Sequence, residues 1–197
     1  MIAEAELFLQ ADQAVVAVFS AIRDDQWELL LPPVFDMPGA DQPIPLRTAV
    51  DHYAYDNSWV PDMLAGRTMD EVGRDRFDGD LLGDDPTGQL VRIGAAAAAA
   101  ARQVDDRDGL AHFSYGDAPI WNYFWQLNIA RTLSAHDTAA VIGASCPLSE
   151  ELSRRMWEGT EPMAQVWRAY GVYREALPVP GDAARRDRFL ALSGRRP

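Results

Sequence analysis

Apolar residues recur at helical spacing along most of the chain, most clearly over residues 119–143, where a glycine ends the pattern. Side chains three or four positions apart lie on one face of a helix, so this spacing predicts a long helix. Its apolar stripe consists of Trp125, Ile129, Leu133, His136 and Ala140. Comparable patterns predict further helices over residues 3–23, 46–65, 86–104 and 149–170, and a short one over 183–192.

Breaks in the pattern mark the connections between these helices. Residues 31–45 hold five prolines and a glycine, and proline removes a backbone donor and blocks a helix, so a loop is predicted. Pro162 should kink or split the helix in which it lies. A short extended piece is expected over residues 110–115. Strand patterns are otherwise negligible.

Residues 66–86 are rich in aspartate and glycine and form a long connection for a compact domain. We expect Phe77, Leu81 and Leu82 to fasten this connection to the helices. The predicted class is therefore all-α, with four main helices packed as a bundle over residues 1–175. A C-terminal extension, residues 176–197, is expected to pack on the same domain.

Composition narrows the range of functions. The chain has 197 residues, 48% of them hydrophobic, and a formal net charge of -12. All 18 basic residues are arginines and they are scattered, so nucleic-acid binding is not expected. The N-terminal residues lack the positive start of a signal peptide and no apolar run is long enough to cross a membrane, so we expect a cytoplasmic protein. The single cysteine, Cys146, excludes an internal disulfide and a cysteine-based zinc site.

Two histidines are the main candidates for chemistry. His136 lies on the apolar stripe of the long helix, and His52 flanks the stripe of the helix over residues 46–65. A bundle can bring two such imidazoles together to bind zinc, nickel or iron, although a catalytic zinc site usually has three protein ligands. The alternative is that His136 is a hydrogen-bonded core residue and that His52 pairs with Asp56 one turn later.

The aromatic residues allow two interpretations. The tryptophans, including Trp59 and Trp125, either fill wide spaces between helices or line an apolar ligand cavity. Arg131 and Asp137 are expected at the flanks of the long helix, in salt bridges or in solvent. If a cavity exists, we expect its walls to include Asp56, Trp59, Trp125 and Thr132.

Four stretches of the chain carry a family resemblance: IPLRTAVDHYAYDNSW, DRFDGDLLGDDP, LNIARTLSAHDTAAVIG and LPVPGDAARRDRFLALSGRRP. They resemble the DinB-like superfamily, and specifically its actinobacterial branch related to the N-terminal domain of mycothiol-dependent maleylpyruvate isomerase. Together with the order of the helices, they cover nearly the whole chain. The resemblance implies a four-helix bundle with a cleft that holds a divalent metal, commonly zinc or nickel, and dimerisation is compatible with it.

The resemblance implies three metal ligands, a histidine on the second helix and two residues on the fourth. His52 falls on the first position. An ungapped alignment places Ser134 and Ala130 at the two ligand positions of the fourth helix. If the alignment is shifted so that His136 takes one of these positions, Thr132 takes the other. The triad is incomplete either way.

Two functions follow from these observations. The first is a metal- and mycothiol-dependent transferase or isomerase acting on a small molecule, with the metal held weakly or not at all through His52 and His136. The second is a metal-free protein that binds a small ligand or acts as a scaffold and has kept the fold without catalysis.

Overall fold

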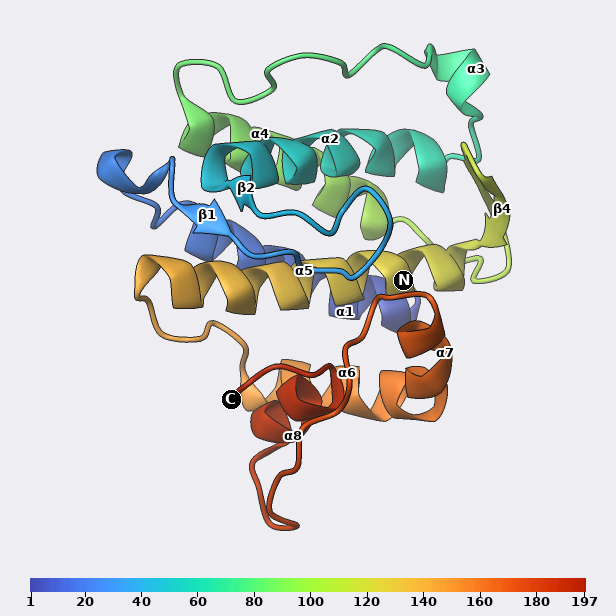
Figure 1. The fold of residues 1–197 in the computed structure, drawn as a ribbon. Helices are drawn as coiled ribbons and strands as arrows, with labels where there is room; N and C mark the ends of the chain where they lie inside the picture. Colours follow the sequence, from blue (N-terminus) through green and yellow to red (C-terminus); the bar gives the residue numbers. More distant parts are fainter.

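The structure is a computed structural model that describes residues 1–197, and it is mostly helical (Figure 1). The two sheets are small, antiparallel and two-stranded, one pairing β1 with β2 and the other β3 with β4. The β3–β4 hairpin contains the extended piece expected over residues 110–115, whereas β1–β2 was not expected. The strands are Leu30–Leu31 (β1), Ile44–Pro45 (β2), Leu110–Phe113 (β3) and Gly116–Pro119 (β4).

Apart from α3, which forms in the connection expected over residues 66–86, the helices lie close to the predicted positions. The long ones are Ala3–Phe19 (α1), Leu46–Leu64 (α2), Pro86–Ala101 (α4) and Ile120–Ile142 (α5). The short ones are Met69–Val72 (α3), Glu150–Thr160 (α6), Ala164–Ala169 (α7) and Arg185–Leu192 (α8), and two 3-10 turns cover Asp24–Gln26 and Glu161–Met163. The predicted break at Pro162 is confirmed, because the 3-10 turn that contains it separates α6 from α7.

Local chemistry explains several helix ends. The Asp85 side chain accepts a hydrogen bond from the Gly88 amide at 3.0 Å, and Pro86 follows as the first helical residue. The Ser149 hydroxyl accepts from the Leu152 amide at 3.1 Å in the same way. Gly143 ends α5 in the left-handed conformation, with φ of 72°, which a residue without Cβ adopts readily.

The long helices pack pairwise around the core. α1 lies against both α5 and α4, and α2 lies against α4, whereas α2 and α5 are not in close contact along their length (Figure 1). Apolar side chains such as Phe8, Val15 and Phe124 are fully buried between these helices. The looser spacing of α2 and α5 leaves room for side chains and for a cavity between them.

The C-terminal part forms a layer below α1 and α5, in which α6 packs against α8 (Figure 1). Phe189 and Leu190 of α8 are fully buried. Arg195 is also buried, with its guanidinium 2.9 Å from the carboxylate of Asp137 on α5. The last residues of the chain are thus attached to the long helix.

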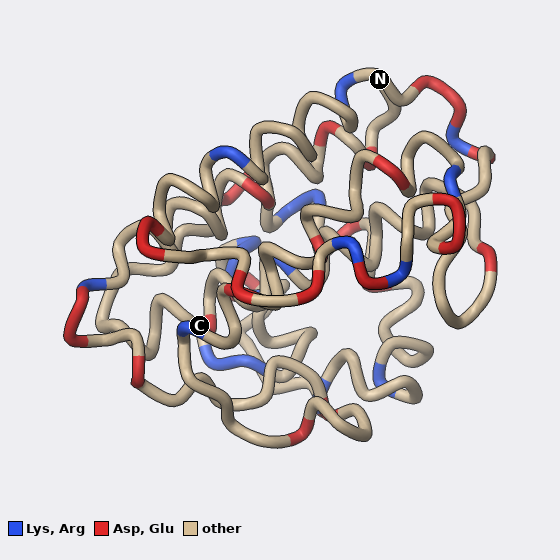
Figure 2. Tube along the Cα trace, turned by 90° about the horizontal axis from the view of Figure 1, so that it is seen from above, with Lys and Arg blue, Asp and Glu red and all other residues tan.

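The acidic connection between α2 and α4 is fastened as predicted. Leu82 is fully buried, and Phe77 packs edge-on against Trp59 with ring centroids 4.9 Å apart. The Leu81 amide donates to a carboxylate oxygen of Asp51 at 2.9 Å. Basic residues are spread along the chain among acidic ones (Figure 2). None of the helices has the length and apolar character needed to cross a membrane.

Candidate functional site

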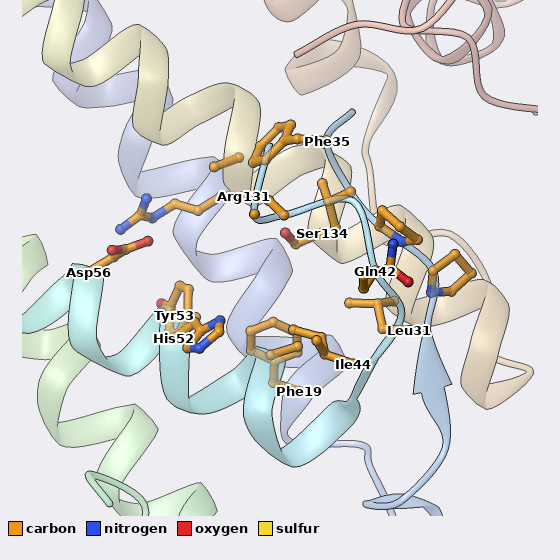
Figure 3. Close-up of a pocket in the computed structure, with 17 residues that line it drawn as sticks. Phe19, Leu31, Phe35, Gln42, Ile44, His52, Tyr53, Asp56, Arg131 and Ser134 are labelled. Atoms are coloured by element: carbon orange, nitrogen blue, oxygen red, sulfur yellow. The ribbon is translucent and has the colours of Figure 1, made fainter. Parts of the chain in front are cut away.

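A cavity of about 280 Å³ lies between α2 and α5, beneath the proline-rich segment that joins β1 to β2 (Figure 3). One part of its wall is apolar, because α1 and the proline-rich segment contribute hydrophobic side chains there. The other part is polar and comes from the facing surfaces of α2 and α5. The apolar wall includes Phe19, Leu31, Val34, Phe35, Ile44 and Ala49, and the polar wall includes His52, Tyr53, Asp56, Arg131 and Ser134.

His52 and Asp56 are the two polar side chains of α2 that are free to meet a ligand. They lie one helical turn apart, both line the cavity, and both are exposed to solvent there. Neither makes a hydrogen bond or an ion pair with another side chain. A ligand that enters the cavity therefore meets an imidazole and a carboxyl group that need no prior rearrangement.

The carboxyl group of Asp56 is accessible to water but surrounded by protein on most sides. This crowding raises its pKa above the ordinary value, while the positive charge of Arg131 and the nearby His52 oppose the rise. Arg131 does not form an ion pair with Asp56, although both side chains point toward the same end of the cavity (Figure 3). A carboxyl group with a perturbed pKa in a concave site is a common feature of functional sites.

Arg131 is held in place by a buried polar network below the cavity. Its Nε donates to Oδ1 of Asp12 on α1 at 3.0 Å, and its Nη2 donates to the amide oxygen of Asn57 on α2. The same Asp12 oxygen accepts from the Tyr53 hydroxyl at 2.7 Å and from Asn57 Nδ2 at 3.0 Å. The network therefore joins three helices at one carboxylate.

This network neutralises charge inside the core. Arg131 and Asp12 are 3% and 5% exposed, so each ion depends on the other for compensation. The guanidinium also lies over the rings of Phe8 at 4.7 Å and Tyr53 at 5.4 Å. Burial, and then the negative charge of Asp12, raise the pKa of Tyr53 well above its ordinary value, so its hydroxyl remains a donor.

The two histidines expected to share a site lie in different places. His136 does not line the cavity; it is half-buried, with Nδ1 3.4 Å from the sulfur of Cys146. Burial lowers the pKa of His136 and raises that of Cys146, which favours the uncharged form of both. The reason is geometric: Ser134 faces the cavity, and two further residues turn a helix by roughly 200°.

The other expected cavity residues also lie elsewhere, apart from Asp56. Trp59 is 5% exposed and packs in the core beside Phe77. Trp125 faces α6, close to Gly159. Thr132 is fully buried and its hydroxyl donates to the Asn128 carbonyl of its own helix at 2.8 Å. These three side chains fill space between elements and do not line the cavity.

The cavity brings together the residues that the ungapped alignment matched to metal ligands. His52, Ala130 and Ser134 all line it. Alanine offers no ligand atom, and a serine hydroxyl is a poor substitute for a histidine or carboxylate. No three His, Cys, Asp or Glu side chains are grouped so that they could hold a metal ion. His52 and Asp56 alone do not make the three-ligand set, so we derive no metal chemistry from this site.

The buried network was not foreseen from the sequence. Arg131 was expected at a helix flank, and the structure corrects its position to the core, although the expected salt bridge is present. Asp12 lies between the apolar residues Ala11 and Val15 on the buried side of α1, and this charge on an apolar stripe was the available signal. Its partners are 41 to 119 residues away in sequence, so no local pattern identifies them.

No protein-family model, no curated protein and no solved structure matches this chain.

Proposed function

We propose that this chain binds a small molecule in the cavity between α2 and α5, without a metal ion. The proposal includes the finer architecture, a DinB-like four-helix bundle formed by α1, α2, α4 and α5. The resemblance in the sequence supports this architecture, together with a cavity between the second and fourth long helices, where the family has its cleft.

The observation that carries the proposal is the combination of an apolar wall with two unpaired polar groups in one cavity. Ligand sites are typically concave and largely apolar, with a few polar groups that orient the ligand. Here Phe19, Leu31 and Ile44 supply apolar contacts, and His52 and Asp56 supply the polar ones. The volume is close to the lower limit of about 300 Å³ for such sites, so the ligand is small.

A second candidate function is catalysis, as a member of the mycothiol-dependent transferase and isomerase group. The observation in its favour is that His52 and Asp56, which can exchange protons, lie together in a cavity where the pKa of Asp56 is raised. A zinc or nickel ion and mycothiol belong to this candidate through the resemblance alone. Calorimetric titration with zinc tests it, because one equivalent bound by the wild type and lost in His52→Ala would favour it over the metal-free function.

Two further expectations accompany the proposal. The first is a cytoplasmic location, and the second is a homodimer formed through the bundle helices. Light scattering of the purified chain over a range of concentrations measures its mass directly, and a mass that stays at 21.8 kDa would contradict the dimer.

Chemical-shift mapping with a neutral probe tests the binding function. We expect 2-phenylethanol, added to the isotope-labelled protein, to shift the amide signals of residues that line the cavity, such as Ala49 and Ser134. Ala130→Phe should abolish these shifts, because the new ring fills the cavity from α5. Ala140→Phe is the matched control, since Ala140 is exposed on the same helix and does not line the cavity. Saturable shifts that Ala130→Phe leaves unchanged would contradict the proposal.

A further inference from the structure

The two charged side chains on the polar wall of the cavity, Arg131 and Asp56, differ in their ion-pair partners. The positive charge of Arg131 is compensated within the core, because Asp12 accepts a hydrogen bond from Arg131 Nε at 3.0 Å. Asp56 has no corresponding partner: no arginine pairs with it, and no donor hydrogen-bonds to its carboxylate. His52 is the only other titratable side chain on the polar wall besides Tyr53, whose hydroxyl is bound to Asp12.

The Asp56 carboxylate is exposed to solvent in the cavity, and a ligand that covers it there would remove it from water. Removing a charge from water costs free energy unless a partner of opposite charge or a set of donors replaces the lost water. The crowding that raises the pKa of Asp56 is a sign of this cost. A ligand that brings a positively charged donor to Asp56 would relieve it, whereas a ligand carboxylate would increase the repulsion.

Tyr115 and Tyr123 lie outside the cavity, but the charge of Asp56 affects both of them. Burial is the main cause of the raised pKa of both tyrosines; the negative charge of Asp56 adds to the rise, and the positive charge of Arg131 opposes it at Tyr123. Tyr115 donates its proton to Gln126 Oε1 at 2.7 Å, so it is already engaged and does not satisfy Asp56. The net charge of -12 adds a long-range attraction for cations over the whole molecule.

We propose that the cavity selects a small primary amine whose ammonium group binds the Asp56 carboxylate and whose apolar body lies against Phe19, Leu31 and Ile44. This inference rests on the proposed function and specifies the class of ligand for the same site. The ammonium group donates up to three hydrogen bonds, of which the Asp56 oxygens accept one or two. His52, one turn away, is placed to accept or donate a further one.

Three probes of similar shape test the inference: 2-phenylethylamine, 2-phenylethanol and 3-phenylpropionate, which carry a positive, a neutral and a negative end. We expect the amine to bind the wild-type protein about tenfold more tightly than the alcohol, because hydrogen bonds between charged groups are about twice as strong as neutral ones. The carboxylate should bind most weakly. Affinities are measured by calorimetry or from NMR titrations at one ionic strength.

Two variants separate the effect of the Asp56 charge in the cavity from the effect of the acidic surface as a whole. Asp56→Asn keeps the shape of the side chain and removes its charge, so the preference for the amine should disappear. Asp75→Asn removes the same charge from an exposed residue of the acidic connection that does not line the cavity, so it should keep the preference. Melting curves establish that both variants are folded.

The outcomes distinguish the inference from the function on which it rests. If the alcohol binds in the cavity and the amine binds no more tightly, the inference is overturned and the binding function stands. A preference for the amine that survives in Asp56→Asn would assign the effect to the acidic surface and would also overturn the inference. If no probe binds, both the inference and the proposed function fail.

Discussion

Substituting Asp12 with asparagine should destabilise the protein strongly, although the two side chains have nearly the same shape. Asp12 is 5% exposed and accepts hydrogen bonds from Tyr53, Asn57 and Arg131. The substitution removes the only carboxylate that forms an ion pair with the buried guanidinium of Arg131, which is 3% exposed. The positive charge then remains in the core without a partner.

The expected loss is about 3–5 kcal/mol in the free energy of unfolding, which is typical when one partner of a buried ion pair is removed. A domain of ordinary stability has about 5–15 kcal/mol in total, so this is a large fraction. With a urea m-value of about 3 kcal/mol/M, the unfolding midpoint should fall by roughly 1–2 M.

Urea unfolding followed by circular dichroism measures this difference. Glu6→Gln is the matched control, because it removes a carboxylate from an exposed position of the same helix, and it should change stability by less than about 0.5 kcal/mol. The double variant Asp12→Asn/Arg131→Met should lose less than the sum of its single variants, by about 0.5–3 kcal/mol, because it leaves no uncompensated charge.

The reasoning would be refuted if Asp12→Asn behaved like Glu6→Gln. It would also be refuted if the two substitutions at Asp12 and Arg131 were simply additive. Either result would mean that the guanidinium of Arg131 does not depend on Asp12 in the folded protein.

Three further predictions follow from other contacts. Asp56→Asn should raise the melting temperature at pH 7 but not below about pH 4. Because the pKa of Asp56 is raised in the folded protein, the protonated carboxyl group favours folding, and this stabilisation is lost as the pH rises through the folded-state pKa. Arg195→Gln should speed amide exchange in residues 31–44, measured by mass spectrometry, because Arg195 Nη2 donates to a carbonyl of this segment at 2.6 Å; unchanged exchange would contradict this role. Gly159→Ala should cost about 1–3 kcal/mol in urea unfolding, because its Cβ would overlap the indole of Trp125; a gain in stability would show that the ring moves freely.

The helices were predictable because their signals are local. The spacing of apolar residues and the capping residues Asp85, Ser149 and Gly143 lie within a few positions of the ends that they determine. Two helices end earlier than expected: the first was expected to reach residue 23 and ends at Phe19, and the helix expected over 86–104 ends at Ala101. Ile22, the last apolar residue of the pattern that predicted the first helix, lies in the turn after that helix and is still buried.

The cavity was less predictable, because it depends on which face of α5 meets α2. This helix is covered on several sides: Ile129 and Leu133 are buried in one cluster, and Phe124 and Leu127 in another. Apolar spacing therefore marks more than one face and does not identify the one that holds Ala130 and Ser134. His52 and Asp56 were easier to identify, since they are polar residues four apart beside a single clear stripe on α2.

Contacts between distant segments could not be predicted at all. The proline-rich cover of the cavity is held by hydrogen bonds to the C-terminal layer, including those from Asp36 to the Gly171 carbonyl and from Arg195 to the Val34 carbonyl. The first bond joins two backbone atoms and the second joins the Arg195 side chain to a backbone carbonyl. Every residue possesses a backbone carbonyl, so the sequence does not identify the acceptor.

The location of a bound amine is the most direct test of a ligand site between α2 and α5. Nuclear Overhauser contacts between bound 2-phenylethylamine and protein methyl groups report that location. We predict contacts from the phenyl protons to methyl groups of Leu31, Val34 and Ile44, and from the carbon beside the nitrogen toward the end of the cavity at Asp56. Contacts instead to the exposed residues Met163 and Val166, which lie far along the chain and outside the cavity, would contradict the assignment of this cavity as the ligand site.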